Sequence, residues 1–393
     1  CLVFISIVIV CIALLYWRMY SVLQLDKGFK ELNAEGCTLL SGIIGAEDSA
    51  QISSDVIIFS SDDRMKLWES PGIAKDVPNG GLFVLYSNNN ELRTSQLLLN
   101  DFPNHVKFHP HGIYLLKEDE KMMLYVINHA YSDGGERVDV FEVRLESNND
   151  IPVSVHYKYS VGNEFFSKYS NGILNDILVL REGSFFITQY LAFQDPQEGR
   201  KYGMGINGIL NLLSVIFKLQ WASIRYCTYN PLSNTIDKSV ECTIVANGSS
   251  YNGINRNNQG NILFVSDPTE REIHTYKLEE NTKLSLLTKI KLPHSVDNIE
   301  LEESTNSHFL GSITGSVLTH IKRIHSRSSN SSDLLFNPGG AMQLFFNDTS
   351  YEYTINELIS QNGEQLSSIA VACPFQSSFI ILGSWEDNGI LIC

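Results

Sequence analysis

The sequence lacks the short motifs that mark several common enzyme and metal-binding folds. It contains no G-x-S-x-G turn, no H-E-x-x-H motif, no glycine-rich phosphate loop and no C-x-x-C pair among its seven cysteines. These absences weaken a serine α/β-hydrolase, a zinc metallopeptidase, a P-loop nucleotide-binding protein and a zinc ribbon or thioredoxin.

Basic charge is also scarce. Lys and Arg number 29 against 44 Asp and Glu, which gives a formal charge of -15. Nucleic-acid binding requires a basic surface, so this balance argues against DNA or RNA as a partner and is better suited to cation binding. With 43% hydrophobic residues, the 393-residue chain has ample material for a packed core.

No series of long amphipathic helices is present, and short strand-like runs dominate from residue 55 onward. Typical runs are DVIIFSS, MMLYVIN and SFFITQY, and turn clusters such as YSNNN and NRNNQG separate them. This spacing is typical of an all-β repeat protein.

One pattern recurs six times: a polar residue able to bind a ligand, a few apolar residues, a turn and a second apolar run. The leading residues are spaced by roughly 45 to 75 positions, the length of a four-stranded unit with variable loops. The pattern predicts a six-bladed β-propeller whose polar tips meet in a central tunnel that holds a metal. The six tips are Glu47-Asp48, His111, Asn175-Asp176, Asn252, Asp297-Asn298 and Ser368.

The chain begins with an apolar segment that has no charge before Arg18. Its length is at the short end of the roughly 17 to 25 residues that a membrane span needs. No small-residue cleavage site follows, so we expect residues 1–20 to be an uncleaved signal anchor and residues 32–393 to form the propeller. The expected location is the secretory pathway, with the propeller membrane-anchored in the lumen or outside the cell, or secreted.

The cysteine positions suggest how the ring closes. Cys37 precedes the first repeat and Cys393 is the last residue, so a disulfide between them would tie the two ends of the propeller together. Cys227 and Cys242 flank an NPLSN turn and could bridge a hairpin, which leaves Cys373 as a buried free thiol.

Three Asn-x-Ser/Thr sequons agree with an oxidising, secretory environment, although such triplets also arise by chance in a chain rich in Asn and Ser. The predicted glycosylation sites are Asn247, Asn330 and Asn347.

The stretch from Gly205 to Trp221 is apolar except for one lysine and predicts a helix lying over one face of the propeller. Two interpretations remain open. Such a helix would either contact lipid or cap a substrate pocket, or it would simply pack against the propeller surface.

Six segments in register, together with the terminal cysteines, resemble the paraoxonase family of calcium-dependent lactonases and arylesterases. The resemblance extends from about residue 32 to the end of the chain. The segments are GIIGAEDSAQI, FHPHGI, VINHA, NGILNDIL, YNGIN and SVDNI.

The resemblance implies two calcium ions, for which the oxygen atoms of carboxylates, amides and backbone carbonyls are the preferred ligands. One ion is catalytic and the other is structural and buried. The residues matching the catalytic site are Glu47, Asn175, Asn252, Asp297 and Asn298. Those matching the structural site are Asp48, Asp176 and the backbone carbonyl of Ile113.

The resemblance also implies a histidine dyad of His111 and His129. His111 would activate the attacking water, and His129 would orient His111 and stabilise its positive charge. Calcium would polarise the carbonyl of the substrate. The alternative is that His111 only lines the tunnel and His129 only fills the core. His109 should face the other side of its strand and is left out of the site.

Several pocket positions depart from the family. Gln189, Tyr190 and Leu191 replace the usual Asn-Asp-His, and Ser312 and Ile313 replace the usual Cys-His. We expect calcium binding to survive these changes, whereas substrate range and turnover are open.

The predicted function is therefore calcium-dependent hydrolysis of small lactones and aryl esters. The alternative is a membrane-anchored, non-catalytic relative that acts as a chaperone or an accessory subunit of a membrane protein. A membrane or lipid surface is expected to be contacted through the N-terminal segment.

Overall fold

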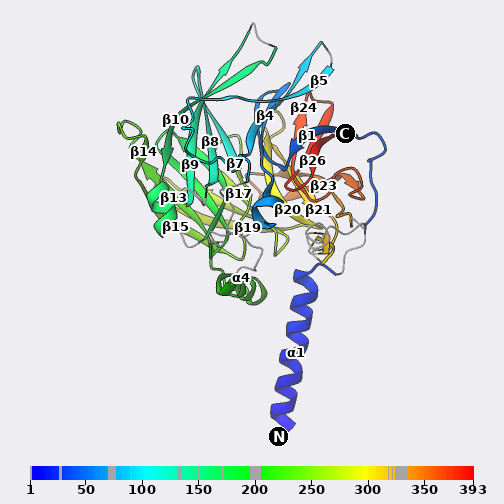
Figure 1. The fold of residues 1–393 in the computed structure, drawn as a ribbon. Helices are drawn as coiled ribbons and strands as arrows, with labels where there is room; N and C mark the ends of the chain where they lie inside the picture. The colour runs from blue at the N-terminus through cyan, green and yellow to red at the C-terminus, as the bar shows by residue number, and fades with distance from the viewer. Residues whose placement is uncertain are drawn as a thin grey trace.

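The protein is a six-bladed β-propeller, as predicted from the repeat (Figure 1). The computed structural model describes residues 2–25, 29–69, 77–89, 91–130, 135–147, 150–169, 172–194, 205–316, 318–320, 322–323 and 335–393. Neighbouring strands within each blade are antiparallel, apart from two short edge strands that pair in parallel with the second blade.

The blades follow the chain in order, and each begins at the tunnel and ends at the rim. The first blade consists of β2 (Ala46–Ser53), β3 (Val56–Ser61), β4 (Gly81–Asn88) and β5 (Glu91–Gln96). The second consists of β7 (Pro110–Glu118), β8 (Lys121–Ala130), β9 (Gly135–Leu145) and β10 (Val153–Val161). The third consists of β11 (Ile173–Arg181), β12 (Ser184–Leu191), β13 (Ala222–Tyr229) and β15 (Val240–Gly248). The short strands β6 (Leu99–Asn100) and β14 (Asp237–Lys238) lie against β10.

The remaining blades complete the ring. The fourth blade consists of β16 (Ile254–Arg256), β17 (Ile262–Asp267), β18 (Glu272–Leu278) and β19 (Leu284–Lys291). The fifth consists of β20 (Ser295–Glu302), β21 (Ser307–Ile313), β22 (Gly339–Phe346) and β23 (Tyr353–Gln361). The sixth consists of β24 (Ile369–Phe375), β25 (Phe379–Ser384), β26 (Asn388–Ile392) and β1 (Thr38–Ile44).

The hydrophobic core lies between adjacent blades. Ile127 and Val138 of the second blade pack with Leu174 and Ile187 of the third, and all four are fully buried. Both faces of a strand within a blade are covered by neighbouring blades, so runs such as VIIFSS in β3 are buried along their whole length. This explains why these strands read as continuous apolar runs rather than alternating ones.

The two ends of the chain close the ring in the sixth blade. The N-terminal strand β1 pairs antiparallel with the C-terminal strand β26, and Cys37 and Cys393 form a disulfide. A second disulfide joins Cys227 and Cys242 across the β13–β15 pair, and Cys373 is a buried free thiol. The cysteine predictions are confirmed.

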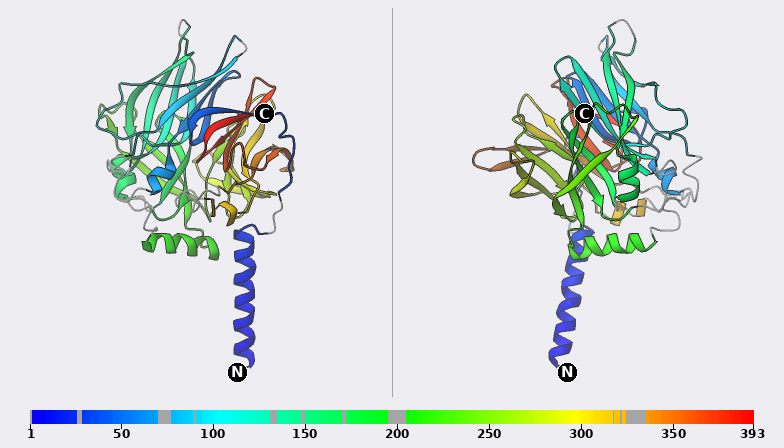
Figure 2. Two further views of the ribbon diagram at one scale, coloured as in Figure 1. Left: turned by 45° about the vertical axis from the view of Figure 1, so that its right-hand side comes forward. Right: turned by 90° about the vertical axis from the view of Figure 1, so that its left-hand side faces the viewer.

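The longer helices lie at one end of the propeller. The helix α1 (Leu2–Val22) projects from this end and α4 (Gly205–Phe217) lies across it, as the views in Figures 1 and 2 agree. Arg18 joins them: it donates to the carbonyls of Val215 at 2.8 Å and Ile216 at 3.0 Å and forms an ion pair with Glu270.

In the part of the chain that the structure describes, no helix combines the length and apolar character required to traverse a bilayer. Two short helices, α2 (Arg64–Glu69) and α3 (Asn163–Tyr169), follow β3 and β10.

Removing the terminal disulfide should destabilise the protein strongly. In the chain-entropy model, opening a bridge of 356-residue separation costs on the order of 5 kcal/mol, against about 3 kcal/mol for the hairpin bridge of 15-residue separation. We expect Cys37→Ala/Cys393→Ala to lower the midpoint of denaturant unfolding more than Cys227→Ala/Cys242→Ala does. Equal losses would show that the first and last strands pair stably without a covalent link.

Candidate metal and catalytic site

The six polar tips lie where the inner strands approach the tunnel, and glycines allow this close approach. A Cβ atom on Gly112 would lie 2.3 Å from the carbonyl oxygen of Asn175, and one on Gly253 would lie 2.7 Å from that of Asp297. Real Cβ atoms do not come so close to backbone oxygens, so glycine must follow His111 and Asn252 for the strands to meet. The motifs FHPHG and YNG therefore position the tips.

Four buried side chains from four different blades each carry an oxygen atom without a hydrogen-bond donor. These oxygens are Oε2 of Glu47 and Oδ1 of Asn175, Asn252 and Asn298, and the four residues are at most 5% exposed. Leaving a buried polar atom unpaired costs about 1–3 kcal/mol. Carboxylate and amide oxygens are the ligands that calcium prefers, so the donor set fits a calcium ion.

The nitrogen atoms of two of these amides have partners, which fixes the direction of their oxygens. Asn298 Nδ2 donates to the backbone carbonyl of Glu47 at 2.8 Å and to its Oε1 at 3.1 Å. Asn175 Nδ2 lies 3.1 Å from His111 Nε2, which is also 3.5 Å from Glu47 Oε1. The fifth predicted ligand, Asp297, is partly buried on the same strand as Asn298.

Asp48 and Asp176 occupy matching positions in the first and third blades, and each joins its own blade to the next. Asp48 accepts from the backbone N–H of Ile113 at 2.6 Å, and Asp176 accepts from that of Ile254 at 2.7 Å. The N–H of Ile113 thus faces Asp48, whereas the sequence-based expectation concerned its carbonyl.

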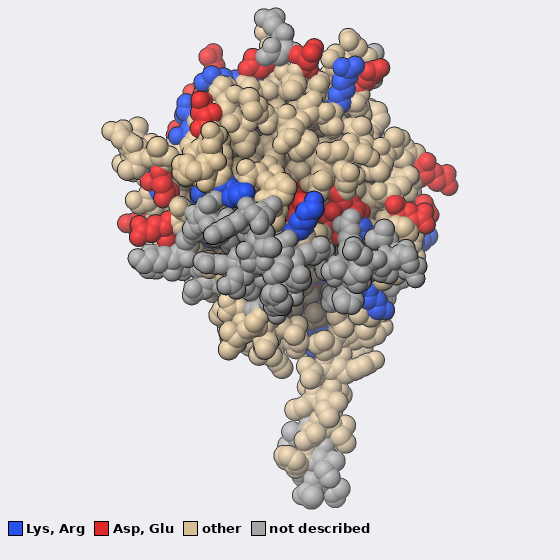
Figure 3. Space-filling view, viewed as in Figure 1, with Lys and Arg blue, Asp and Glu red and all other residues tan. Residues whose placement is uncertain are grey.

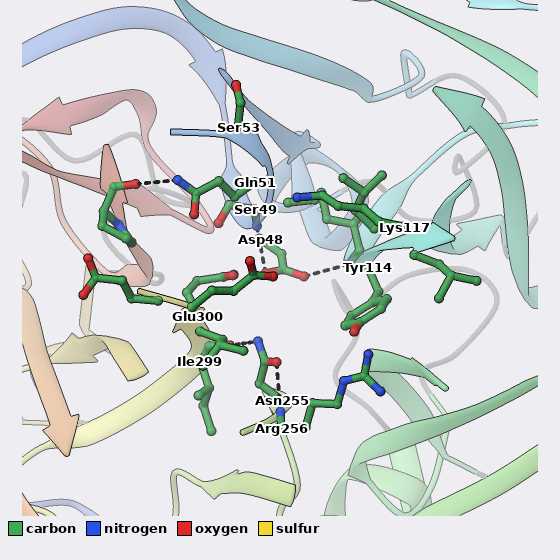
Figure 4. A pocket seen from close by; sticks show the side chains of 18 of the residues that line it. Asp48, Ser49, Gln51, Ser53, Tyr114, Lys117, Asn255, Arg256, Ile299 and Glu300 are labelled. Atoms are coloured by element: carbon green, nitrogen blue, oxygen red, sulfur yellow. Dashed lines mark hydrogen bonds between the residues drawn. The ribbon is translucent and has the colours of Figure 1, made fainter. Parts of the chain in front are cut away.

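A third carboxylate, Glu300, joins Asp48 and was not foreseen. Glu300 follows Asn298 at the two-residue spacing of a strand, and this alternation was the available signal. Glu300 and Asp48 line a cavity of about 450 Å³ whose wall also contains Arg256 and Lys117 (Figure 4). The cavity also reaches Ser53, at the far end of β2 from Glu47, so it lies on the opposite side of the tips.

Burial dominates the electrostatics of these carboxyl groups. Removal from water raises the pKa of Asp48 to about 8, and the negative charge of Glu47 adds to the effect. Burial and neighbouring carboxylates likewise raise the pKa values of Asp176, Asp297 and Glu300. Burial raises the pKa of Glu47 as well, and the positive charge of Arg64 opposes this rise.

No group of three or more His, Cys, Asp or Glu side chains among the described residues is arranged as a metal site by itself. The candidate catalytic ligand set differs from such a group because three of its four unpaired oxygens belong to amides.

The two histidines of the predicted dyad are neighbours. The ring centroids of His111 and His129 are 4.8 Å apart at an interplanar angle of 63°. Nδ1 of His129 lies 3.2 Å from Oε1 of the fully buried Glu136, a residue that sequence reasoning missed. Glu136 also accepts from the N–H of Leu174 and so connects this pair to the third blade.

Two further residues missed from the sequence, Asp62 and Arg64, follow β3 and are nearly completely buried. Asp62 Oδ1 lies 3.2 Å from Nδ1 of His109, which is therefore engaged away from the dyad. Arg64 donates from Nε to Nδ1 of His111 at 3.1 Å. Their charged side chains directly after a predicted strand were the only sequence signal for either residue.

The residues expected from the sequence to depart from the family lie at the same end of the propeller as the tips. Leu191 pairs with Ile173, and Ile313 pairs with Ser295, so β12 and β21 end beside the starts of the inner strands. The oxygen Oε1 of Gln189 accepts from Ser223. The sixth tip, Ser368, donates to Glu386 and lies 3.3 Å from His320 Nδ1.

The raised pKa values predict how pH affects the calcium-free protein. A carboxyl group whose pKa is higher in the folded than in the unfolded state binds more protons when folded, so stability decreases as pH rises. We expect the melting temperature in chelator to fall between about pH 4 and pH 8, the range between ordinary carboxyl values and that of Asp48.

Saturating calcium should remove most of this fall, because the ion replaces the protons. Differential scanning fluorimetry with and without chelator measures both effects. A flat profile in chelator would contradict the electrostatic description, and an equally steep profile in calcium would contradict ion binding.

Comparison with known proteins gives a consistent match. The profile of the family described as "Arylesterase" matches residues 28–390. Rabbit (Oryctolagus cuniculus) serum paraoxonase/lactonase 3 is 25% identical over 88% of this chain and 86% of its own. Bovine (Bos taurus) serum paraoxonase/arylesterase 2 is 26% identical over 74% of this chain and 72% of its own.

A gluconolactonase from Xanthomonas campestris is a structural neighbour at 13% identity and a TM-score of 0.45, covering 93% of both chains.

Proposed function

Because the chain belongs to the arylesterase (paraoxonase) family, we propose that it is a calcium-dependent hydrolase of small lactones or aryl esters. The observation that carries the proposal is the set of four buried, unpaired oxygens on Glu47, Asn175, Asn252 and Asn298. Oxygen atoms left without donors at the meeting point of four blades are explained by a cation that they bind together.

The proposed ligands divide between two ions. Glu47, Asn175, Asn252, Asp297 and Asn298 would hold the catalytic calcium. The carboxylates Asp48 and Asp176 and the backbone carbonyl of Ile113 would hold the structural calcium. Both proposed sites bury carboxyl groups close to one another in the tunnel. This burial raises the pKa values of Asp48, Asp176 and Asp297.

A bound calcium supplies a Lewis acid that polarises the substrate carbonyl and stabilises negative charge on its oxygen. The side chains around it handle the proton. His111 lies next to two proposed ligands, Glu47 and Asn175, and would take the proton of the attacking water. His129 packs against His111 and, with Glu136 beside its ring, would stabilise positive charge on the dyad.

Replacing His111 or a calcium ligand should abolish hydrolysis. We expect His111→Gln to lower kcat/KM for phenyl acetate and small lactones by about 100-fold or more, within the range for loss of a general base. Asn252→Ala should lower activity and weaken calcium binding, whereas His111→Gln should leave calcium-dependent stabilisation largely intact.

The matched control is Ser368→Ala, the tip of the sixth blade, which should retain activity. A stable, calcium-binding protein that hydrolyses none of the substrates would refute the enzyme proposal, and full activity after complete calcium removal would refute the mechanism.

The two disulfides and the family fit the secretory pathway. Two of the proposed glycosylation sites, Asn247 and Asn347, have exposed side chains. The third, Asn330, lies outside the described residues.

We also propose that the end of the propeller bearing α1 and α4 rests on a lipid surface. The buried residues of α4 are Asn211, Ser214 and Val215, and Asn211 bonds to both the N–H and the carbonyl of Phe193. Its apolar side chains Ile206 and Ile209 are instead 73% and 60% exposed. A helix that turns polar groups to the protein and apolar groups outward is suited to a membrane interface.

The projecting helix α1 has the same character. Phe4 and Trp17 are 71% and 70% exposed, and the atoms of the projecting segment that Figure 3 does not draw in grey are tan, the colour of uncharged residues. Side chains of this kind insert into the interfacial region of bilayers. The N-terminal segment and α4 would therefore meet one surface together.

Liposome flotation of the full chain tests this surface. Ile206→Glu/Ile209→Glu should reduce the fraction bound to neutral vesicles, because each charge must be removed from water on insertion. Leu232→Glu is the matched control, since Leu232 is 86% exposed but lies on the β13–β15 connection. Equal loss in both variants, or no loss in either, would count against α4 as a contact.

The alternative function, a membrane-anchored accessory protein or chaperone without catalysis, is favoured by the altered residues Tyr190, Leu191 and Ile313 near the tips. It requires the fold and its surface but not the dyad. The hydrolysis assays above separate the two functions.

A further inference from the structure

An exposed phenylalanine lies on the outer part of the fifth blade. Side chains alternate along the end of β22: Met342, Leu344 and Phe346 are buried, whereas Phe345 is 37% exposed. Phe345 therefore belongs to the face of the strand that meets solvent. Its partner across the sheet, Thr354, is exposed as well. An aromatic face in this position is open to an apolar partner from outside the sheet.

Asn347, the residue of the sequon Asn347-Asp348-Thr349, continues the same face. It follows Phe345 by two positions, and its side chain is exposed. Its backbone N–H donates to the carbonyl of Glu352 at 2.8 Å, so the ladder between β22 and β23 extends through it. Side chains two positions apart in a strand project on the same side, about 7 Å from each other.

The turn fixes the direction of the Asn347 amide. Its Oδ1 accepts from the backbone N–H groups of Thr349 and Ser350, both at 2.9 Å. The oxygen therefore points forward into the turn. Nδ2, the atom to which a glycan is attached, lies on the other side of the planar amide and points back from the turn, on the side of Phe345.

The turn is itself held in place. Oδ2 of Asp348 accepts from Nδ2 of Asn257 at 2.8 Å, which ties the turn to the fourth blade. The N–H of Tyr351 donates to the carbonyl of Asn347 at 2.8 Å, and its ring stacks on that of Phe346 with centroids 6.2 Å apart. A group attached to Asn347 would therefore meet Phe345 on a preorganised surface, which lowers the entropic cost of the contact.

The chemistry of a sugar matches this surface. A pyranose such as N-acetylglucosamine has one face made largely of C–H groups, and packing this face on a phenyl ring removes apolar area of both from water. Its hydroxyl groups remain at the rim, in contact with solvent. The other sequon asparagine among the described residues, Asn247, has the partly buried Val245 two positions before it instead of an exposed aromatic residue.

We propose that Asn347 carries an N-linked glycan whose first sugar packs on the ring of Phe345. The inference rests on the glycosylation and secretory location put forward under the proposed function. It does not depend on calcium or on hydrolysis.

The rate at which a peptide N-glycosidase releases the glycan from the folded protein tests the proposal, because the enzyme must first expose the first sugar. The full chain is made in a glycosylating secretory host and kept in detergent, and mass spectrometry of glycopeptides follows Asn347. We expect Phe345→Ser to accelerate release about 2- to 10-fold, the change expected for loss of one aromatic contact. An unoccupied Asn347, or equal rates in the two proteins, would overturn the proposal.

Three controls separate packing from other effects. Phe345→Tyr keeps an aromatic ring and should retain slow release. Phe379→Ser replaces a phenylalanine that is also 37% exposed but belongs to β25 of the sixth blade, and it should leave the rate at Asn347 unchanged. Denatured wild-type protein and denatured Phe345→Ser should be cleaved at the same rate.

Faster release in Phe379→Ser would show a general loosening of the propeller and would overturn the proposal. A difference between wild type and Phe345→Ser that persists after denaturation would show that the glycosidase reads Phe345 directly, and would also overturn it.

The outcomes distinguish this inference from the proposed function. If Asn347 is occupied and the rates are equal, glycosylation at this position stands and only the packing on Phe345 fails. If Asn347 is unoccupied, the proposed modification at this position fails as well. If none of these proteins hydrolyses lactones or aryl esters, the proposed enzyme activity fails, whereas the release rates still test the contact.

Discussion

The burial of oxygen atoms at the axis of the propeller is the constraint on which the rest of the structure depends. The inner strands bring carboxylates and amides from several blades to one line, where water no longer screens them. Such a line of oxygens is stable only if protons, cations or hydrogen-bond donors compensate for its negative charge and lost hydration. The backbone N–H groups of Ile113 and Ile254, the guanidinium of Arg64 and the amide of Asn298 supply part of this compensation.

Much of the fold was accessible from the sequence because it depends on local, repeated signals. The apolar runs and turn clusters predicted the blades, and the positions of Cys37 and Cys393 predicted how the ring closes. The tips were found because each stands at the same place in its repeat. The sequence did not predict that α4 turns a mostly polar side to the propeller, because an apolar sequence does not show which side of a helix is buried.

The missing parts of the site are those whose role depends on contacts between blades. Arg64, Asp62 and Glu136 lie outside the repeated pattern, and only the folded ring brings them to the histidines. Glu300 stood two residues from a predicted ligand, yet its partner Asp48 is far away in sequence. Periodicity identifies which residues face the axis, whereas the partners of those residues require the three-dimensional arrangement.

The pairing of β1 with β26 has a consequence for how the protein is made. The strand that completes the last blade, β1, precedes the other blades in the sequence, and its partner β26 follows all of them. During translation the emerging blades therefore form an open arc with two unpaired edges, which exposes them to wrong partners. The arc can become a ring only when β26 is available to pair with β1, so the polar groups on the axis reach their final order after all six blades have been synthesised.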